Sequence, residues 1–270
     1  MIAFPNAKIN LGLRILRKRG DGYHDIQTYM VPVSMCDALE IVPSNEGFAY
    51  TGSGILVDGS EDSNLCVKAY RLYEKYYKVN TVKIHLHKII PMGAGLGGGS
   101  SNGAFTLTLL RKLNNLKLCN AELEGMAALL GSDCPFFILN RPQLIEQTGV
   151  PTHKYLHIPQ YHVVIVVPDI HINTAWAYSI IKPSGVNIPD QEMLLNKEDN
   201  WPELLYNDFE EPVFSHFPVL SEIKKELYDA GAFYASMTGS GSAIYGLFKN
   251  KPEVTGRFND HFVWVGKTLC

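Results

Sequence analysis

The sequence has no long hydrophobic run and no basic stretch. Its longest aliphatic run, VVIVV at 163–167, is too short to cross a bilayer. The beginning, MIAFPNAKIN, has neither the basic start nor the long apolar core of a signal peptide. A formal charge of −3 is spread along the chain, which argues against an extended nucleic-acid surface. We therefore expect a cytoplasmic protein with small charged ligands and with neither a membrane nor a nucleic acid as partner.

The sequence is also poor in cysteine and contains no C-x-x-C pair. An odd number of cysteines without such pairs argues against both a disulfide framework and a structural zinc site. His85 and His87 share one face of a predicted strand, but no third metal ligand has a supportive spacing. We expect reduced, mostly buried thiols and no metal site built from protein ligands alone. The cysteines are Cys36, Cys66, Cys119, Cys134 and Cys270.

The 270 residues, 46% of them hydrophobic and 19% charged, are typical of a globular protein with a sizeable core. Strand and helix patterns alternate without a series of long βαβ crossovers, which predicts an α+β fold. The pattern restarts at about residue 151. We expect two domains, at 1–150 and 151–270, and the sequence gives no view of the oligomeric state.

Hydrophobic periodicity predicts the main elements of the first domain. Alternation predicts half-buried strands over 8–16 and 81–90, with Lys88 in phase with the apolar face of the second. Helical spacing predicts a helix over 62–77, capped by Asp62 or Ser63, and another over 121–130, between Asn120 and a left-handed Gly131. A further helical turn begins at Pro135.

The second domain is predicted in the same way. We expect strands at 161–167, on either side of GSGS at 239–242, and at 261–265. One helix opens at Asn173 or Thr174, and another ends at Gly231. The polar, proline-containing segment 182–202 is predicted to be a loop.

The stretch GAGLGGGSSN at 93–102 places a glycine-rich loop between a strand and a helix, which Ser100 or Ser101 would cap. The P-loop pattern fails because Gly99, and not lysine, precedes Ser100. A dinucleotide fingerprint matches at Gly93, Gly95 and Gly98, but it needs a second parallel strand ending in an acid, and the sequence runs from helix to helix. A flexible linker does not fit between two ordered elements. We favour a triphosphate cradle made by loop amides, the helix N-terminus and the serine hydroxyls.

Three motifs occur in order: PNAKINLGL at 5–13, PMGAGLGGGSSN at 91–102 and MTGSGSAIYG at 237–246. With them the chain resembles the GHMP small-molecule kinases over its full length. The resemblance implies an N-terminal ATP-binding domain like the second domain of ribosomal protein S5 and a ferredoxin-like C-terminal domain. It also implies ATP as the phosphate donor, bound as its Mg²⁺ complex, with the ion held mainly by phosphates and water.

Two further stretches, DGYHDIQT at 21–28 and LLGSDCPFF at 129–137, are similar to one branch of this family. That branch phosphorylates the 2-hydroxyl of a cytidine diphosphate-linked methylerythritol in non-mevalonate isoprenoid biosynthesis. A GHMP kinase acting on mevalonate or homoserine is the nearest alternative, and the GYH signature separates the two. A non-catalytic nucleotide or RNA-binding module is an alternative of another class, against which the lack of a basic patch argues.

The resemblance implies two catalytic residues. Asp133, the aspartate of the LGxDxP pattern, would accept the proton of the acceptor hydroxyl. Lys8, from the PxxKxN pattern, would hold Asp133 ionised and stabilise the transferred charge. A plain helix cap at Asp133 and a solvated strand face at Lys8 are the structural alternatives. Asn10 projects from the same face as Lys8 and is expected to bind substrate.

Lys88 precedes the proline of the glycine loop by three residues, where the resemblance implies contact with the base or ribose of ATP. Asn64 and Asn102 fall near the nucleotide in the family, and each could instead cap a helix. The expected ATP-binding residues are Lys88, Pro91, Met92, Gly93, Ala94, Gly95, Leu96, Gly97, Gly98, Gly99, Ser100, Ser101, Asn102 and Asn64.

For the acceptor, the resemblance implies that Tyr23 and His24 of the GYH signature receive the cytosine by stacking and by polar contacts. Thr174 and Tyr178, on the predicted helix, would complete this site, with Tyr178 as the second stacking aromatic. Trp176 competes with Tyr178 for that role, and a core position is the structural alternative for Tyr178. The GSGS turn resembles the third family motif, which steadies the phosphate loop, although a plain turn would also explain it.

Overall fold

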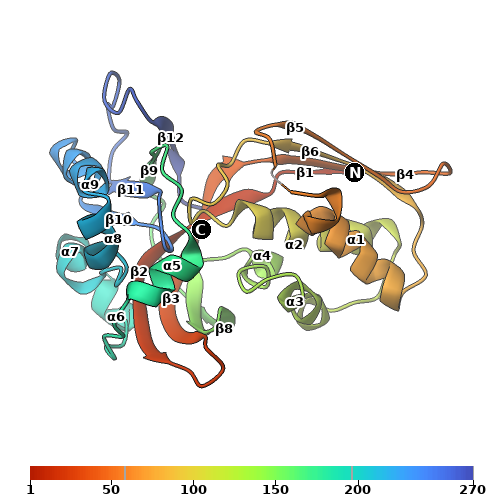
Figure 1. Ribbon diagram of the computed structural model, residues 1–270, viewed down its shortest axis with the longest axis horizontal. Helices are drawn as coiled ribbons and strands as arrows, with labels where there is room; N and C mark the ends of the chain where they lie inside the picture. Colours follow the sequence, from red (N-terminus) through yellow and green to blue (C-terminus); the bar gives the residue numbers. More distant parts are fainter. Residues whose placement is uncertain (58, 196, 270) are drawn as a thin grey trace. The chain divides into compact units, whose positions relative to one another are not determined.

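The chain folds into two compact units, each built from three separate stretches of sequence. The first unit holds residues 1–7, 35–92 and 97–140, and the second holds 8–34, 93–96 and 141–270. The computed structural model describes residues 1–57, 59–195 and 197–269. Helices and strands are mixed in both units, which confirms the expected α+β class (Figure 1).

The strands are β1 (Ile2–Ala3), β2 (Asn6–Lys18), β3 (His24–Cys36), β4 (Ala38–Pro43), β5 (Ala49–Gly54), β6 (Val82–Lys88), β7 (Gln143–Gln147), β8 (Val150–Tyr155), β9 (His162–Val167), β10 (Tyr234–Met237), β11 (Ile244–Phe248) and β12 (Phe262–Lys267). The α-helices are α1 (Leu65–Tyr76), α2 (Gly98–Leu113), α3 (Asn120–Ala128), α4 (Phe136–Leu139), α5 (Thr174–Ile180), α6 (Gln191–Leu194), α7 (Trp201–Leu204), α8 (Glu210–His216) and α9 (Val219–Asp229). Two short 3-10 helices are η1 (Glu61–Ser63) and η2 (Glu198–Asn200).

The first unit is a four-stranded sheet covered on one face by helices. The strand order is β1-β4-β6-β5, antiparallel except for the parallel pair of β5 and β6. Its core joins Leu39, Ile84 and Leu86 of the sheet to Tyr73 of α1 and Leu110 of α2. Burial alternates along β6, because one face of the strand packs against these helices. Lys88 ends the strand on that buried face, as its phase predicted.

The second unit contains two four-stranded sheets, with strand orders β10-β11-β9-β12 and β2-β3-β7-β8. Helices α5, α8 and α9 pack with the first of these sheets around Val164, Val166, Ile223 and Leu227. The prediction that β2 is half-buried was wrong, since every residue from Asn6 to Ile15 is buried. Its polar face is covered as well. A Cβ at Gly12 would lie 3.2 Å from the Leu205 side chain.

Several predicted helix ends differ from the observed ones in the first unit. Helix α1 is capped by Asn64, whose Oδ1 accepts a hydrogen bond from the Cys66 amide at 2.9 Å, because Asp62 and Ser63 belong to η1. Helix α3 includes Asn120 and is preceded by Cys119 as its N-cap residue. Gly131 is not among the glycines with positive φ.

In the second unit, the predicted helix ends agree better with the observed ones. Asn173 caps α5 by accepting from the Trp176 amide at 3.0 Å, and Gly231 follows α9 with φ of 95°. Strands β10 and β11 lie on either side of the GSGS turn, as predicted. The segment 182–202 was predicted as a loop, which was wrong in part, because α6, η2 and the start of α7 lie in it.

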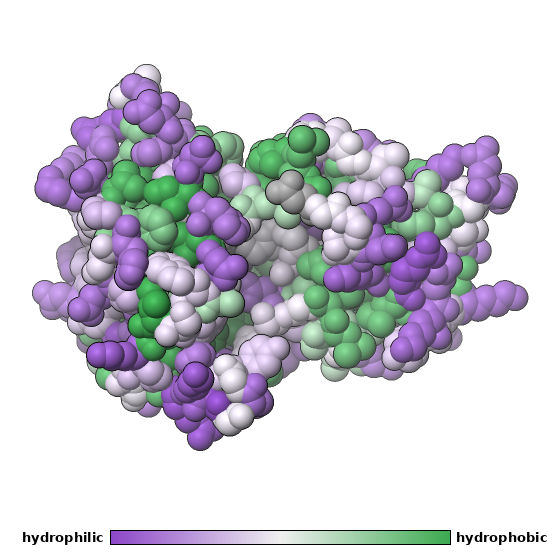
Figure 2. Space-filling model, in the orientation of Figure 1, coloured by the Kyte–Doolittle hydropathy of each residue, from purple (hydrophilic) through white to green (hydrophobic). Residues whose placement is uncertain are grey.

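Hydrophobic side chains occur in several groups between hydrophilic ones on the visible surface (Figure 2). The strongly exposed apolar side chains are scattered through the sequence, with Leu56 at 87% and Leu129 at 66% exposure among them. In the parts of the chain that the structure describes, no helix has the length and apolar character needed to cross a membrane. Within these parts, the thiols of Cys66 and Cys134 are buried and that of Cys119 is exposed.

Candidate active site

The glycine-rich loop has a backbone that few residues other than glycine adopt. Gly93, Gly95 and Gly97 have φ of 67°, 77° and 69°, in the left-handed region where a Cβ is strained. A Cβ at Gly95 would also lie 2.0 Å from the carbonyl oxygen of Thr238. The glycines are therefore required by backbone conformation and by close packing, which a flexible linker would not need.

Helix α2 begins inside the glycine run, with Gly97 as its cap residue and Gly98 as its first residue. The expectation that Ser100 or Ser101 caps this helix was wrong, because both lie in its first turn. Ser100 is half-buried, whereas Ser101 is fully buried and its hydroxyl has no hydrogen-bond partner among the described residues. The early start leaves the amides at the N-terminus of a 16-residue helix beside bare glycine backbone, an arrangement that favours anions.

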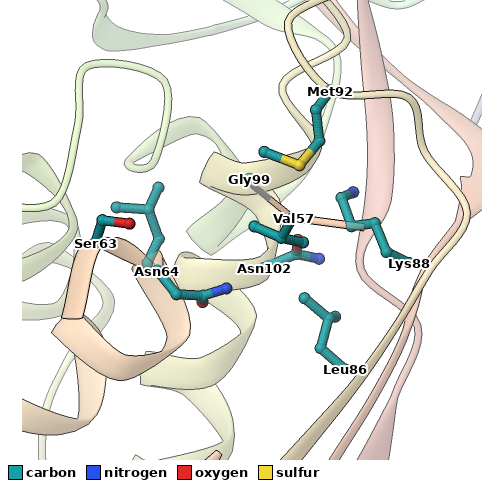
Figure 3. A pocket seen from close by; sticks show the side chains of 9 residues that line it. Val57, Ser63, Asn64, Leu86, Lys88, Met92, Gly99 and Asn102 are labelled. Carbon is teal, nitrogen blue, oxygen red and sulfur yellow. The ribbon is translucent and has the colours of Figure 1, made fainter. Parts of the chain in front are cut away.

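A pocket of 180 Å³ lies in the first unit between η1, α1, α2 and β6, and we call it the Lys88 pocket (Figure 3). Its walls are partly apolar, with the polar ends of Asn64, Lys88 and Asn102 among them (Figure 3). The pocket joins five residues that the sequence assigned to one ligand. The lining residues are Val57, Ser63, Asn64, Leu65, Leu86, Lys88, Met92, Gly99 and Asn102.

Lys88 is paired with a carboxylate that the sequence reasoning missed. Its Nζ donates to Oδ2 of Asp37 at 2.5 Å, and both side chains are almost fully buried. The same Oδ2 accepts from Nδ2 of Asn102 at 2.8 Å. Burial lowers the pKa of Lys88, and the charge and hydrogen bond of Asp37 oppose that shift. Asp37 follows β3 with no neighbouring motif, so no sequence pattern marked it.

Asn64 combines its capping role with a place in the pocket. Its Oδ1 is engaged by the Cys66 amide, and its Nδ2 donates to the Tyr50 hydroxyl at 2.8 Å. Burial raises the pKa of Tyr50 to about 12, so the phenol remains protonated at neutral pH. Asn102 caps no helix, since it lies inside α2. Both asparagines therefore have fixed side chains at the pocket.

In the second unit, Asn10 connects the first and third motifs. Its Oδ1 accepts from Nζ of Lys8 at 2.7 Å, from the Thr238 hydroxyl at 3.0 Å and from the Gly239 amide at 2.9 Å. Lys8 is 3% exposed, so the solvated strand face considered for it is wrong. The Lys8 amide also donates to the carbonyl oxygen of Leu96 at 2.9 Å. The GSGS turn is thus more than a plain turn, because the amide of its Gly239 donates a hydrogen bond to Asn10.

We call the three residues expected to take cytosine, Tyr23, His24 and Tyr178, the His24 cluster. The rings of His24 and Tyr178 stack with centroids 5.0 Å apart and planes 26° apart, whereas Tyr23 is 66% exposed. Trp176 packs instead against His216 and Phe217. Desolvation, and secondarily the charge of Lys18, lowers the pKa of His24, which favours the neutral imidazole.

Two other expected site residues occupy defined positions. Thr174 opens α5, and its hydroxyl is 3.3 Å from that of Ser240 in the GSGS turn. Asp133 is half-buried in the turn between α3 and α4. It is not the N-cap of α4, since Pro135 holds that position. The histidine pair of β6 contacts hydroxyl groups, with Nδ1 of His85 2.8 Å from Thr51 Oγ1 and Nδ1 of His87 2.9 Å from Ser53 Oγ.

Comparisons with known proteins identify the family. A model described as GHMP kinases N terminal domain matches residues 64–141, and one described as GHMP kinases C terminal matches residues 191–259. The chain is 48% identical over 261 residues to a protein of Azobacteroides pseudotrichonymphae, covering 96% of this chain and 97% of the relative. It is 47% identical over 274 residues to one of Bacteroides thetaiotaomicron, covering 100% and 98%. The chain belongs to the GHMP kinase family.

Both relatives of this GHMP kinase are named 4-diphosphocytidyl-2-C-methyl-D-erythritol kinase. A crystal structure of 4-(cytidine 5'-diphospho)-2C-methyl-D-erythritol kinase superposes with a TM-score of 0.83 at 30% identity, covering 99% of each chain. The mevalonate kinase of Methanococcus jannaschii superposes with a TM-score of 0.71 at 14% identity, a likeness of fold alone. The expected GHMP kinase fold and family are confirmed.

Proposed function

We propose that this GHMP kinase transfers the γ-phosphoryl group of ATP to the 2-hydroxyl of 4-diphosphocytidyl-2-C-methyl-D-erythritol, in the non-mevalonate route to isoprenoid precursors. The observation that carries the proposal is the full-length similarity to kinases of that name, at 47–48% identity in the two relatives above. A cytoplasmic location fits this role.

The Lys88 pocket suits the base and ribose of ATP better than its phosphates. Its partly apolar walls suit the faces of a flat heterocycle such as the base. The positive charge of Lys88 is already compensated by Asp37, so the pocket adds little net attraction for a phosphate. The glycine loop and the N-terminus of α2 are the better phosphate site, since their amides are fixed donors that need no counter-charge.

Asp133 would accept the proton as the acceptor 2-oxygen forms a bond to the γ-phosphorus and the bond from that phosphorus to the β,γ-bridging oxygen breaks. ADP leaves with that electron pair. Lys8 would stabilise the charge on the transferred group, and Asn10 fixes the lysine in place at 2.7 Å. Positioning and charge stabilisation supply most of the rate of such transfers, so groups with few alternative positions suit the role.

Mg²⁺ would enter with ATP. The described residues contain no group of three or more His, Cys, Asp or Glu side chains that could hold a metal ion. Phosphate oxygens and water would supply most of the ligands of the ion, because Mg²⁺ gives up its bound water reluctantly. The ion would neutralise charge on the β- and γ-phosphates, and we assign it no protein ligand.

The His24 cluster would hold the cytidine end of the acceptor. A cytosine ring can stack on the exposed face of Tyr23, and the neutral imidazole of His24 offers one donor and one acceptor for its polar edge. Tyr178 is favoured over Trp176 as the second aromatic because it is the ring beside His24. Thr174 would contribute through its hydroxyl.

We retain the division into an N-terminal ATP-binding domain at 1–150 and a C-terminal domain at 151–270. The two family-model matches, at 64–141 and 191–259, fall on opposite sides of residue 150. The compact units are defined by packing and not by order along the chain, since each is built from three separate stretches of sequence. The expected partners are small molecules, and we propose neither a nucleic acid nor a membrane.

ADP release against a panel of acceptors tests this function. The panel contains diphosphocytidyl methylerythritol, methylerythritol phosphate, mevalonate and homoserine, each with ATP and Mg²⁺. We expect ATP-dependent turnover of the cytidine-containing acceptor well above that of the other three. Faster turnover of mevalonate or homoserine would favour the alternative kinases, and equal or absent turnover of the cytidine compound would contradict the proposal.

A further inference from the structure

One buried carboxylate accepts hydrogen bonds from two side chains of the Lys88 pocket without lining the pocket itself. Asp37 is 1% exposed and accepts four hydrogen bonds. Oδ2 accepts from Lys88 and Asn102, both of which line the pocket. Oδ1 accepts from the amides of Ile89 and Ile90 at 2.7 and 2.8 Å. These amides belong to the segment that leads from β6 into the glycine loop.

We infer that Asp37 is a positioning residue for nucleotide binding, which fixes the Lys88 ammonium, the Asn102 amide and the entry to the glycine loop in one arrangement. The inference rests on the proposed function, because it assumes that the Lys88 pocket takes ATP. Asp37 touches no substrate in this account. It acts through the groups that it holds.

The position of the Lys88 ammonium has little freedom. A Cβ on Gly98 would lie 2.8 Å from Nζ, so the ammonium packs against the first residue of α2. A cation beside a helix N-terminus is unfavourable, because that end carries partial positive charge. Asp37 supplies the compensating negative charge and also bonds to Asn102 of the same helix. Without this carboxylate, the ammonium would have to move, lose its proton or bind another anion.

A purely structural role is the competing explanation, since any buried ion pair destabilises the fold when one partner is removed. Substitutions of Asp37 can separate the roles. In Asp37→Asn, the side-chain oxygen can still accept from the two loop amides, but the new amide faces two donors, Lys88 and Asn102. Asp37→Ala removes the hydrogen bonds to the two pocket side chains and also those to the two loop amides. Asp37→Glu keeps the charge and displaces it by one methylene, which tests geometry apart from charge.

The primary measurement is calorimetric ATP binding with Mg²⁺ on the full chain, together with KM for both substrates. We expect Asp37→Asn to raise the Kd for ATP at least tenfold while the KM for the acceptor changes less than twofold. Asp37→Ala should weaken ATP binding further, because the hydrogen bonds to the amides that lead into the glycine loop are also lost. Asp37→Glu should remain folded and weaken ATP binding at least threefold.

The double variant Asp37→Asn with Lys88→Met separates stability from positioning. It replaces the charged pair with neutral side chains, so we expect it to regain thermal stability that Asp37→Asn loses, without regaining ATP affinity. Asp208→Asn is the matched control. Asp208 forms an ion pair with Arg14 at 3.1 Å in the second unit, with side chains 11% and 8% exposed. Its loss should lower thermal stability and leave the Kd for ATP unchanged.

Two results would overturn the inference: ATP binding within threefold of the unaltered chain in both Asp37→Asn and Asp37→Glu, or recovery of both stability and ATP affinity in the double variant. Failure of the proposed function has a different signature. The unaltered chain would then bind ATP without phosphorylating the cytidine acceptor, and the Asp37 variants would still weaken ATP binding.

Discussion

The Lys88 pocket and the His24 cluster differ in how their functional groups are held. In the pocket, Lys88 and Asn102 are 2% and 3% exposed and share one carboxylate, and Asn64 is fixed by Tyr50. In the cluster, Tyr23 is largely exposed and the contact between His24 and Tyr178 is a ring stack. Buried hydrogen-bonded groups have one favourable geometry, whereas stacked rings tolerate sliding. The Lys88 pocket is therefore preformed, and the His24 cluster depends more on aromatic surface.

This difference predicts how substitutions divide between the substrates. Changes in the pocket should act on ATP through geometry and charge. Changes in the cluster should act on the acceptor through lost stacking area. A residue of the chemical step should affect turnover while leaving both binding sites intact.

The largest effect is expected for Asp133→Asn, a substitution that lies in neither the Lys88 pocket nor the His24 cluster. It therefore separates the chemical step from binding at either region. The amide cannot accept the hydroxyl proton, so turnover should fall by about 10²–10⁴-fold, the usual contribution of general base catalysis. ATP binding should be retained, because Asp133 does not line the Lys88 pocket. Single-turnover phosphoryl transfer and calorimetric ATP binding measure the two effects. Near-normal turnover would remove Asp133 from the mechanism.

A smaller effect is expected for Tyr23→Ala. Loss of one base-stacking ring costs about 1–3 kcal/mol, so the KM for the acceptor should rise about 5- to 150-fold with the Kd for ATP unchanged. Tyr76→Ala is the matched control, because Tyr76 is a 55% exposed tyrosine at the end of α1 that lines no site described above. Equal changes for ATP and acceptor in Tyr23→Ala would break the comparison between the two regions.

The smallest effect concerns the titration of His24. Burial lowers the pKa of His24 from 6.5, so its ring resonance, identified by its absence from the spectra of His24→Gln, should titrate with a midpoint below 6.5. Because the unfolded chain binds this proton more readily, the neutral ring contributes stability above about pH 6.5, which is lost as the pH falls. An NMR titration from pH 8 to 5 measures the midpoint. A midpoint above 6.5 would contradict the desolvated stack.

Local patterns were sufficient to predict the glycine loop and the phase of Lys88. The loop is a contiguous motif, and a strand has a strict period of two, so a charge in the apolar phase is visible in the sequence. The family resemblance added Asn64 and Asn102, which the structure then brought together with Lys88 in one pocket. These features depend on short stretches of chain or on recognisable motifs.

Features that depend on distant residues were missed. Asp37 is 51 residues from Lys88 and 65 from Asn102, and a single aspartate between two strands has no distinguishing neighbours. The burial of both faces of β2 comes from segments nearly two hundred residues away, such as Leu205 over Gly12. The cap of α2 was misplaced because the helix begins within glycines, which intrinsic propensity disfavours.

The position of the new phosphate tests the central claim most directly. The 2-carbon of the methylerythritol unit carries a methyl group and no hydrogen, whereas the carbons of its other free hydroxyls, 1 and 3, carry hydrogen. We predict that the product made by the unaltered chain from ATP and the cytidine acceptor shows one new phosphorus-31 NMR signal without three-bond coupling to a carbinol proton. A new signal split by such coupling would place the phosphate on another hydroxyl and contradict the account.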